Sequence, residues 1–164
     1  MKTFSALCLT ILLGVSLAPA AQQEGNPQAA KLAREASQAA KDQRFQDALN
    51  DLTESIKIKP DARAYEQRGA IERGINDYDK ALADFAEASK LNPGEIKYHN
   101  YRAYIYETRG DLDNATAENE AALKINSKNK EALDRKARLQ KIKASMGPQQ
   151  PENAPGVPAP PKKP

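Results

Sequence analysis

The sequence predicts an all-α protein built as a stack of two-helix repeats, and two observations lead to that prediction. A pattern of residues recurs along the chain at intervals of 33 and then 34 positions, and a period of this length is typical of helical repeat proteins. Within each interval, apolar and small residues follow the spacing of two amphipathic helices. Helix pairs stacked with a constant small rotation form a right-handed solenoid, which is the fold class we expect.

The composition limits the chain to one domain and excludes several kinds of site. The 164 residues include 25 Lys and Arg against 22 Asp and Glu, a formal net charge of +3, with both signs interspersed. We do not expect nucleic acid as a partner, because such surfaces carry massed cations. One Cys and one His are too few for a Cys/His zinc site, an iron–sulfur cluster or a disulfide framework. We therefore expect no cofactor and no bound metal.

Residues 1–20 are predicted to be a secretory signal peptide. A positive charge precedes an apolar run over residues 4–17, which is shorter than the ~20 residues of a membrane-spanning helix. Small residues follow, so cleavage is expected after Ala20 or, as a second choice, after Ala21. The only cysteine, Cys8, would be removed with the run. We expect a secreted or periplasmic chain without stable membrane insertion, and an uncleaved anchor is the alternative.

Three repeats are predicted to follow a flexible lead-in over residues 21–28. The recurring segment is 45–49, which returns as 78–82 and, more loosely, as 112–115. A small residue lies twelve positions before the alanine of each segment, where it allows two helices to approach closely. These small residues are Ala36, Gly69 and Ala103. The predicted repeats cover residues 29–61, 62–95 and 96–129.

Each repeat is predicted to contain two helices. In the middle repeat they cover residues 62–74 and 78–91, separated by Asn76 and Asp77, which break the first helix and can cap the second. The repeat supplies an ordered set of aromatic, small and proline positions: Tyr65, Gly69, Tyr78, Ala81, Phe85, Ala88 and Pro93. This set resembles the pattern of the tetratricopeptide-repeat family. The resemblance implies a right-handed α-solenoid of about three such repeats.

The sequence departs from the family pattern at several positions. Arg68, Glu72 and Asn76 stand where the family more often has Leu, an aromatic residue and Gly. The first repeat matches fewer positions of the pattern, and the third has Asn119 in place of an aromatic residue of its second helix. For the third repeat, the resemblance therefore leaves the details of packing open.

One more helix is predicted over residues 130–144, without a partner helix. Its charged residues include two pairs spaced four apart, Glu131/Arg135 and Asp134/Arg138, which we expect to form ion pairs. A terminal helix of this kind covers the last repeat with one face and leaves the other in water. With this capping helix, the predicted repeat domain covers residues 29–146.

Residues 147–164 are predicted to be a disordered, partly polyproline II tail. They contain seven of the eleven prolines and show no apolar period, so they bury too little surface to fold. A solubilising end, a spacer and a docking strip for a proline-binding partner all remain open for this segment.

By resemblance to the family, the second, fifth, ninth and twelfth residues of each repeat line the inner wall of the solenoid. Such a wall is a recognition surface rather than a catalytic pocket. In the first repeat these positions carry only small residues, which are Ala30, Ala33, Ser37 and Ala40. In the other two repeats these positions carry longer side chains, apart from Ala70, and Tyr101 lies one helical turn before Tyr104. The candidate protein-binding residues are Arg63, Glu66, Arg73, Lys97, Asn100, Tyr101, Tyr104 and Glu107.

The third repeat contributes the aromatic part of this wall. Tyr101 and Tyr104 beside Asn100 are predicted to hold an extended peptide, because the rings provide contact area and the amide can bind backbone groups. The alternative is that these tyrosines pack between adjacent repeats. His99 falls at an aromatic position of the pattern and is predicted to be a half-buried packing residue rather than a metal ligand.

The predicted function is that of an exported, non-catalytic adaptor that binds a protein or peptide partner. Family members that bind the C-terminal carboxylates of chaperones carry Lys and Asn where this chain has Ala33 and Ser37, so that activity is not expected. The sequence contains no Gly-rich phosphate loop and no nucleophile elbow, which makes an enzyme the weakest option. The alternative is a self-associating structural protein of the cell envelope or extracellular matrix, a homo-oligomer tethered through its tail.

Overall fold

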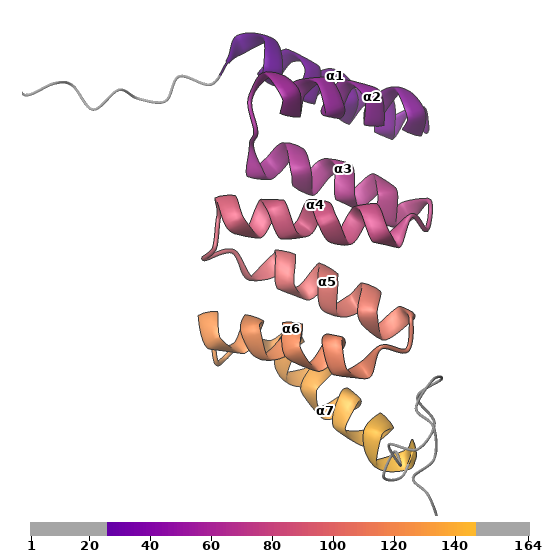
Figure 1. Ribbon diagram of the computed structural model, residues 1–164, viewed down its shortest axis with the longest axis vertical. Helices are drawn as coiled ribbons and strands as arrows, with labels where there is room; N and C mark the ends of the chain where they lie inside the picture. Colours follow the sequence, from indigo (N-terminus) through magenta and orange to yellow (C-terminus); the bar gives the residue numbers. More distant parts are fainter. Residues whose placement is uncertain (1–25, 147–164) are drawn as a thin grey trace, which may run out of the picture.

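The computed structural model describes residues 26–146, and within this range the chain forms seven α-helices and no strand. They are α1 (Pro27–Lys41), α2 (Phe45–Ile58), α3 (Ala62–Gly74), α4 (Tyr78–Leu91), α5 (Ile96–Thr108), α6 (Leu112–Ile125) and α7 (Lys130–Met146). The helices follow one another along one column, with α1 and α7 at opposite ends (Figure 1). The predicted signal peptide over residues 1–20 and the predicted tail over residues 147–164 lie outside the described residues.

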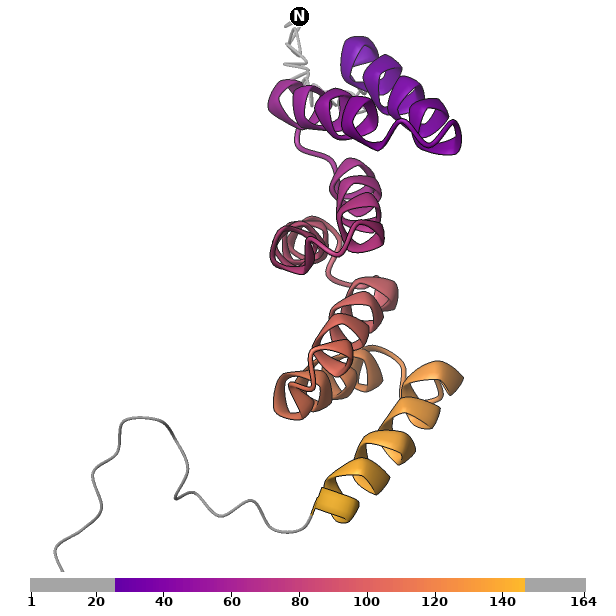
Figure 2. The ribbon, with the colours of Figure 1, turned by 90° about the vertical axis from the view of Figure 1, so that its right-hand side faces the viewer.

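The helices pack as three pairs followed by a single helix. Packing is most extensive within the pairs α1/α2, α3/α4 and α5/α6, while smaller contacts join α2 to α3, α4 to α5 and α6 to α7. A view turned by 90° shows the pairs stepping along the long axis of the molecule (Figure 2). This arrangement confirms the predicted all-α solenoid.

The first helix begins earlier than the sequence analysis expected. Asn26 caps it, since its side-chain oxygen accepts hydrogen bonds from the backbone N–H groups of Gln28 and Ala29 at 2.9 and 3.2 Å. Pro27 follows at the first helical position, where its fixed φ suits a helix and its missing N–H costs nothing. The last two residues of the predicted lead-in therefore belong to α1.

The repeating small and apolar residues form the core. The small residues that precede each recurring segment are all buried, as are the alanines within it: Ala36, Gly69, Ala103, Ala48, Ala81 and Ala115. An added Cβ at Gly69 would lie 3.1 Å from the Cβ of Asp84 and 3.2 Å from the ring of Phe85. The absence of a side chain at Gly69 therefore lets α3 approach α4 closely.

A buried ion pair explains one departure from the family pattern. Arg68 on α3 donates two hydrogen bonds of 2.8 Å to the carboxylate of Asp84 on α4. Thirty-four positions later, Arg102 on α5 forms an ion pair with Glu118 on α6 through its Nη2. Charge-assisted pairs in which the guanidinium fork grips a carboxylate are among the stronger polar contacts. In two of the three pairs, an ion pair thus replaces the apolar contact expected at this position.

The last helix caps the stack as predicted, with one correction. Ala132, Arg135 and Leu139 are buried, while Leu133 on the other face is 45% exposed. Arg135 pairs with Glu131 at 2.9 Å, as expected. The predicted pair of Asp134 with Arg138 is wrong. Asp134 instead accepts from Lys130, at 2.7 Å, because Arg138 turns towards a carboxylate on α5.

Among the helices from α1 to α7, none is long and apolar enough to cross a bilayer.

Candidate functional site

Contacts between the first helices of successive pairs form the candidate site. We call the side chains through which α1, α3, α5 and α7 contact one another the inner face. Each junction on it contains a polar contact: Gln67 Nε2 donates to Ser37 Oγ at 2.8 Å, Lys97 Nζ lies 2.8 Å from Glu66 Oε2, and Asn100 Nδ2 donates to Glu131 Oε2 at 3.0 Å. The inner face is therefore a row of matched polar side chains that runs along the stack.

An aromatic and cationic cluster lies in the middle of the inner face. The guanidinium of Arg73 on α3 lies 5.4 Å from the ring centre of Tyr101 and 5.5 Å from that of Tyr104, both on α5. Tyr101 also packs on the core, with its ring centre 4.8 Å from that of Phe85. Tyr104 is 48% exposed. Cation–π attraction at these distances holds Arg73 in place, and the ring of Tyr104 stays open to a partner.

Glu66 and Lys97 are joined across the junction of α3 and α5. The hydrogen bond to Glu66 raises the pKa of Lys97 above its usual value, so the ammonium stays charged and paired. The same ammonium lies 5.4 Å from the ring centre of Tyr98, which is buried in the core. These two charges therefore link neighbouring helices rather than standing as separate binding groups.

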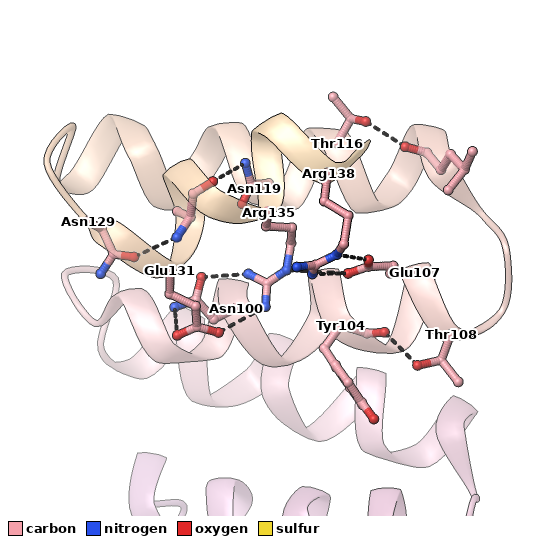
Figure 3. A network of polar contacts seen from close by, with 12 residues as sticks. Asn100, Tyr104, Glu107, Thr108, Thr116, Asn119, Asn129, Glu131, Arg135 and Arg138 are labelled. Carbon is pink, nitrogen blue, oxygen red and sulfur yellow. Dashed lines mark hydrogen bonds and ion pairs between the residues drawn. The ribbon is translucent and has the colours of Figure 1, made fainter. Parts of the chain in front are cut away.

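A polar network joins α5 to α7 at the end of the inner face (Figure 3). Asn100 is only 6% exposed; its amide donates to Glu131, and its oxygen accepts from Arg135 Nη1 at 3.1 Å. Glu107 accepts two hydrogen bonds from Arg138, at 2.6 and 2.8 Å. These bonds hold the pKa of the Glu107 carboxyl below its usual value.

The eight residues predicted from the sequence thus fall into four groups. The structure brings Arg73, Tyr101 and Tyr104 together, pairs Glu66 with Lys97, joins Asn100 and Glu107 to α7, and leaves Arg63 apart. Arg63 is exposed and forms no ion pair with another residue between 26 and 146. Among the tyrosines, the open ring of Tyr104 points away from the network in Figure 3.

The sequence analysis did not identify Arg135 and Arg138 as residues of the inner face. They lie 34 positions after Tyr101 and Tyr104, so the repeat period, carried on into α7, places them at the equivalent positions. Glu107 contacts these two arginines as Arg73 contacts the two tyrosines. The period was the signal that could have identified them.

His99 lies outside this face, between the two helices of the third pair. Its Nδ1 lies 2.9 Å from a carboxylate oxygen of Glu118, and 17% of its side chain is exposed. Within residues 26–146, no group of three or more His, Cys, Asp and Glu side chains is placed to hold a metal ion.

Comparison with known proteins gives relatives in sequence. No family model matches the chain. It is 35% identical to human Tetratricopeptide repeat protein 13 over 81 residues, which are 49% of this chain and 9% of that protein. It is 31% identical to Hsp70-Hsp90 organizing protein 2 of Arabidopsis thaliana over 115 residues, 68% of this chain and 20% of that protein. The chain spans about a fifth or less of the length of these relatives.

Solved structures of similar shape include two that were determined as complexes. The TPR2B domain of yeast Sti1 in its complex with pHsp70 has a TM-score of 0.64 and 19% identity, over 72% of this chain and all of that one. The type III secretion chaperone SycD of Yersinia enterocolitica, in complex with a peptide of the translocator YopD, has a TM-score of 0.59 and 16% identity, over 71% and 90%. The described chain has the fold of a tetratricopeptide-repeat domain, and its sequence is similar to those of tetratricopeptide-repeat proteins.

Proposed function

We propose that this chain is a non-catalytic adaptor that is exported from the cytoplasm and binds a peptide or protein partner on its inner face. The observation that carries the proposal is the cluster of Arg73, Tyr101 and Tyr104. Tyrosine and arginine are enriched where proteins bind one another, because each combines a large apolar area with directional polar groups. The similar domains of Sti1 and SycD were solved with protein or peptide partners, which supports a binding role.

The chemistry of the cluster favours an extended segment that places a side chain against Tyr104. Tyr104 is 48% exposed, and Arg73 is held beside its ring by cation–π contacts to Tyr101 and Tyr104. A partner group that covers the ring gains contact area without ordering a flexible side chain, since the cation–π contacts already restrict Arg73. We expect this position to contribute a large share of the binding free energy.

The partner that we propose is not a chaperone tail held in the manner that the family resemblance describes. That manner of binding uses Lys and Asn, where this chain has Ala33 and Ser37. Ser37 Oγ also donates to the backbone oxygen of Ala33 and accepts from Gln67. The two positions therefore lack the cation and the amide on which that activity depends.

The test of this function compares two aromatic residues of similar exposure. The partner is first identified by co-purification with the chain from its native host, and its affinity is then measured with purified components. Tyr104→Ala is expected to raise the Kd about tenfold or more, in the range of an interface hot spot. Phe45, 42% exposed on α2, gives the control Phe45→Ala. An unchanged Kd for Tyr104→Ala with intact helical circular dichroism contradicts the proposal.

Export is tested separately from binding. Cleavage after Ala20 gives a mature chain of 164 − 20 = 144 residues, which intact mass measurement of the protein from the extracytoplasmic fraction would detect. Full-length chain retained in the cytoplasm or in the membrane contradicts export. Sedimentation at several concentrations separates the adaptor from a self-associating structural protein, because only self-association makes the mass depend on concentration.

A further inference from the structure

A cavity of about 420 Å³ opens at the α1 end of the inner face. It lies between α1, α3 and the C-terminal end of α2, and alanines such as Ala29, Ala30 and Ala33 form part of its lining. Three cations, Arg34, Lys59 and Arg63, also line it. This volume lies in the range of cavities that hold small ligands or single side chains of a partner.

The repeat pattern explains why the cavity is found at this junction. Ala30, Ala33 and Ala40 stand at the second, fifth and twelfth positions of the first repeat. The equivalent positions carry Arg63, Glu66 and Arg73 in the second repeat, and Lys97, Asn100 and Glu107 in the third. At the later junctions Glu66, Arg73, Asn100 and Glu107 contact the next first helix, whereas the alanines of α1 are too short to do so.

The first junction lacks a carboxylate that the second junction contains. At the second junction, the carboxylate of Glu66 lies 2.8 Å from the ammonium of Lys97. One repeat earlier, Glu66 corresponds to Ala33 and Lys97 corresponds to Arg63. The first junction therefore keeps the cation of the pair, as Arg63. At the position of the carboxylate it has only the methyl group of Ala33.

The charges around the cavity are not balanced within the described chain. Arg34, Lys59 and Arg63 form no ion pair with any residue in 26–146. The one acidic residue of the lining, Asp61, caps α3, and its Oδ1 accepts from the backbone N–H groups of Arg63 and Ala64 at 2.9 and 3.3 Å. The cavity thus presents three cations against one carboxylate that is already engaged.

A second unfilled polar group lies at the same place. Gln67, which lines the cavity, donates from Nε2 to Ser37 Oγ at 2.8 Å. Its Oε1 is buried and has no hydrogen-bond partner in the part of the chain that the structure describes. A buried acceptor without a donor costs free energy, so the first junction carries a polar group that the described chain leaves unsatisfied.

We propose that this cavity binds the side-chain carboxylate of a Glu or Asp residue in an extended segment of the partner, beside Arg63. The carboxylate takes the position that Glu66 occupies one repeat later. The inference rests on the proposed function, because the cavity is one end of the same inner face. The inference adds that the partner carries an acidic residue at a fixed distance from the group that covers Tyr104.

The experiment titrates the isotope-labelled chain with three heptapeptides and follows its backbone amide signals by NMR. One peptide carries two central glutamates with both ends blocked, the second has glutamines in their place, and the third is the glutamine peptide with a free C-terminal carboxylate. We expect the glutamate peptide to shift amides of residues 29–37 and 63–67. Arg63→Gln is expected to raise its Kd about tenfold, the loss of one charge-assisted hydrogen bond.

Two further variants sharpen the test. Ala33→Glu supplies the missing carboxylate within the chain and is expected to abolish the shifts, whereas Lys90→Gln, a paired surface cation on α4, makes the same charge change as Arg63→Gln and is expected to leave the Kd unchanged. Equal shifts with the glutamine peptide, no shifts at millimolar peptide, or no effect of Arg63→Gln overturns the inference. Stronger binding of the third peptide assigns the cavity to a terminal carboxylate and overturns it as well. If Tyr104→Ala weakens partner binding while one of these results is obtained, the inference about the cavity fails but the proposed function stands.

Discussion

Glu72 places a carboxyl group inside the second helix pair, at a position where the family more often has an aromatic ring. The residue is 5% exposed, and its Oε2 has no hydrogen-bond partner among the described residues. Burial and, to a smaller extent, the nearby carboxylate of Asp84 raise the pKa of Glu72 to about 7, while Arg68 acts in the opposite direction. The neutral carboxylic acid is therefore the form that suits the folded chain.

The raised pKa predicts a stability that falls with pH. Below the unfolded pKa of 4.5 the carboxyl is protonated in both states, and the stabilisation of the neutral form is fully present; it is lost as the pH rises through 7. The difference corresponds to about 3 kcal/mol of unfolding free energy, at about 1.4 kcal/mol per pKa unit. Glu72→Gln is expected to exceed the wild type in stability at pH 8 and to approach it at pH 5.

Urea unfolding at the two pH values measures this effect. The control Glu54→Gln changes an exposed carboxylate on α2, and its difference from the wild type is expected to stay within about 0.5 kcal/mol at both pH values. If Glu72→Gln shifts the unfolding free energy by the same amount at pH 5 and pH 8, the carboxyl of Glu72 does not titrate with a raised pKa.

The turns within the helix pairs share one backbone conformation but not one residue. Gln43, Asn76 and Gly110 stand at equivalent positions, with φ angles of 60°, 64° and 75°. A residue other than glycine pays roughly 1–2 kcal/mol for this left-handed region, and asparagine pays less than most. The third pair therefore has the unstrained turn, and the first pair has the most strained one.

Glycine at the first turn is expected to stabilise the chain. Gln43→Gly should raise the unfolding free energy by about 1 kcal/mol, because it relieves the strain at φ 60°, and Asn76→Gly should raise it by less. Thermal and urea unfolding measure both changes. The reverse substitution Gly110→Ala is the control and should destabilise by about 1 kcal/mol. A loss of stability in Gln43→Gly would show that the strain at this turn is smaller than the entropy that glycine adds to the unfolded chain.

The capping helix depends on a charged side chain in its buried face. The side chain of Arg135 is 5% exposed and contacts Asn100, Glu107 and Glu131. Removing it takes the donor from Asn100 Oδ1, while Glu107 keeps its hydrogen bonds from Arg138 and Glu131 keeps that from Asn100. The loss of charge-assisted hydrogen bonds by this buried side chain costs about 1.5–3 kcal/mol. Arg135→Ala is therefore expected to reduce the hydrogen-exchange protection of α7 first. Lys136→Ala, a neighbouring exposed position, should leave protection unchanged, and equal protection in the two variants contradicts a role for Arg135 in docking α7.

Helix positions were predictable from the sequence, but the polar contacts between helices were not. The helices over residues 62–74 and 78–91 were identified because small and apolar residues recur at helical spacing in each. Gly69 in the first helix and Ala81 and Phe85 in the second lie on the faces that meet in the pair. The partner of Arg138 was missed because spacing within a helix offers Asp134 equally well. The choice of Glu107 depends on how α7 lies on α5, and a single-helix pattern does not contain that information.

The same limit applies to the candidate site. Spacing placed Tyr101, Tyr104 and Arg73 on the wall, and the structure brings their side chains together. Asn100 was grouped with them from the same spacing, yet its amide is used by Glu131 and Arg135. Position on a helix face is set by the period, whereas the group that a polar side chain binds is set by the length and charge of its neighbours in space.

As a whole, the molecule is a linear array in which each helix contacts only near neighbours. In such arrays, stability is close to a sum of repeat and interface contributions, so the position of a substitution should decide which helices lose protection. Phe85 on α4 lies in the central core and touches Tyr101 on α5, whereas Leu139 is buried at the end of the stack on α7. The two side chains therefore test opposite cases.

Truncation of each side chain is expected to give a different map of hydrogen exchange. Phe85→Ala should leave a cavity that costs about 3–5 kcal/mol and should lower protection from α3 to α6, because it weakens the second pair and its junction with the third. Leu139→Ala should cost about 2–5 kcal/mol but lower protection mainly in α7 and α6. The helices α1 and α2 should keep theirs, since α7 packs on α6 and lies at the opposite end of the stack (Figure 1). If both variants lose protection uniformly over all seven helices, the chain unfolds as one cooperative unit, and its stability is not the sum of neighbouring repeats.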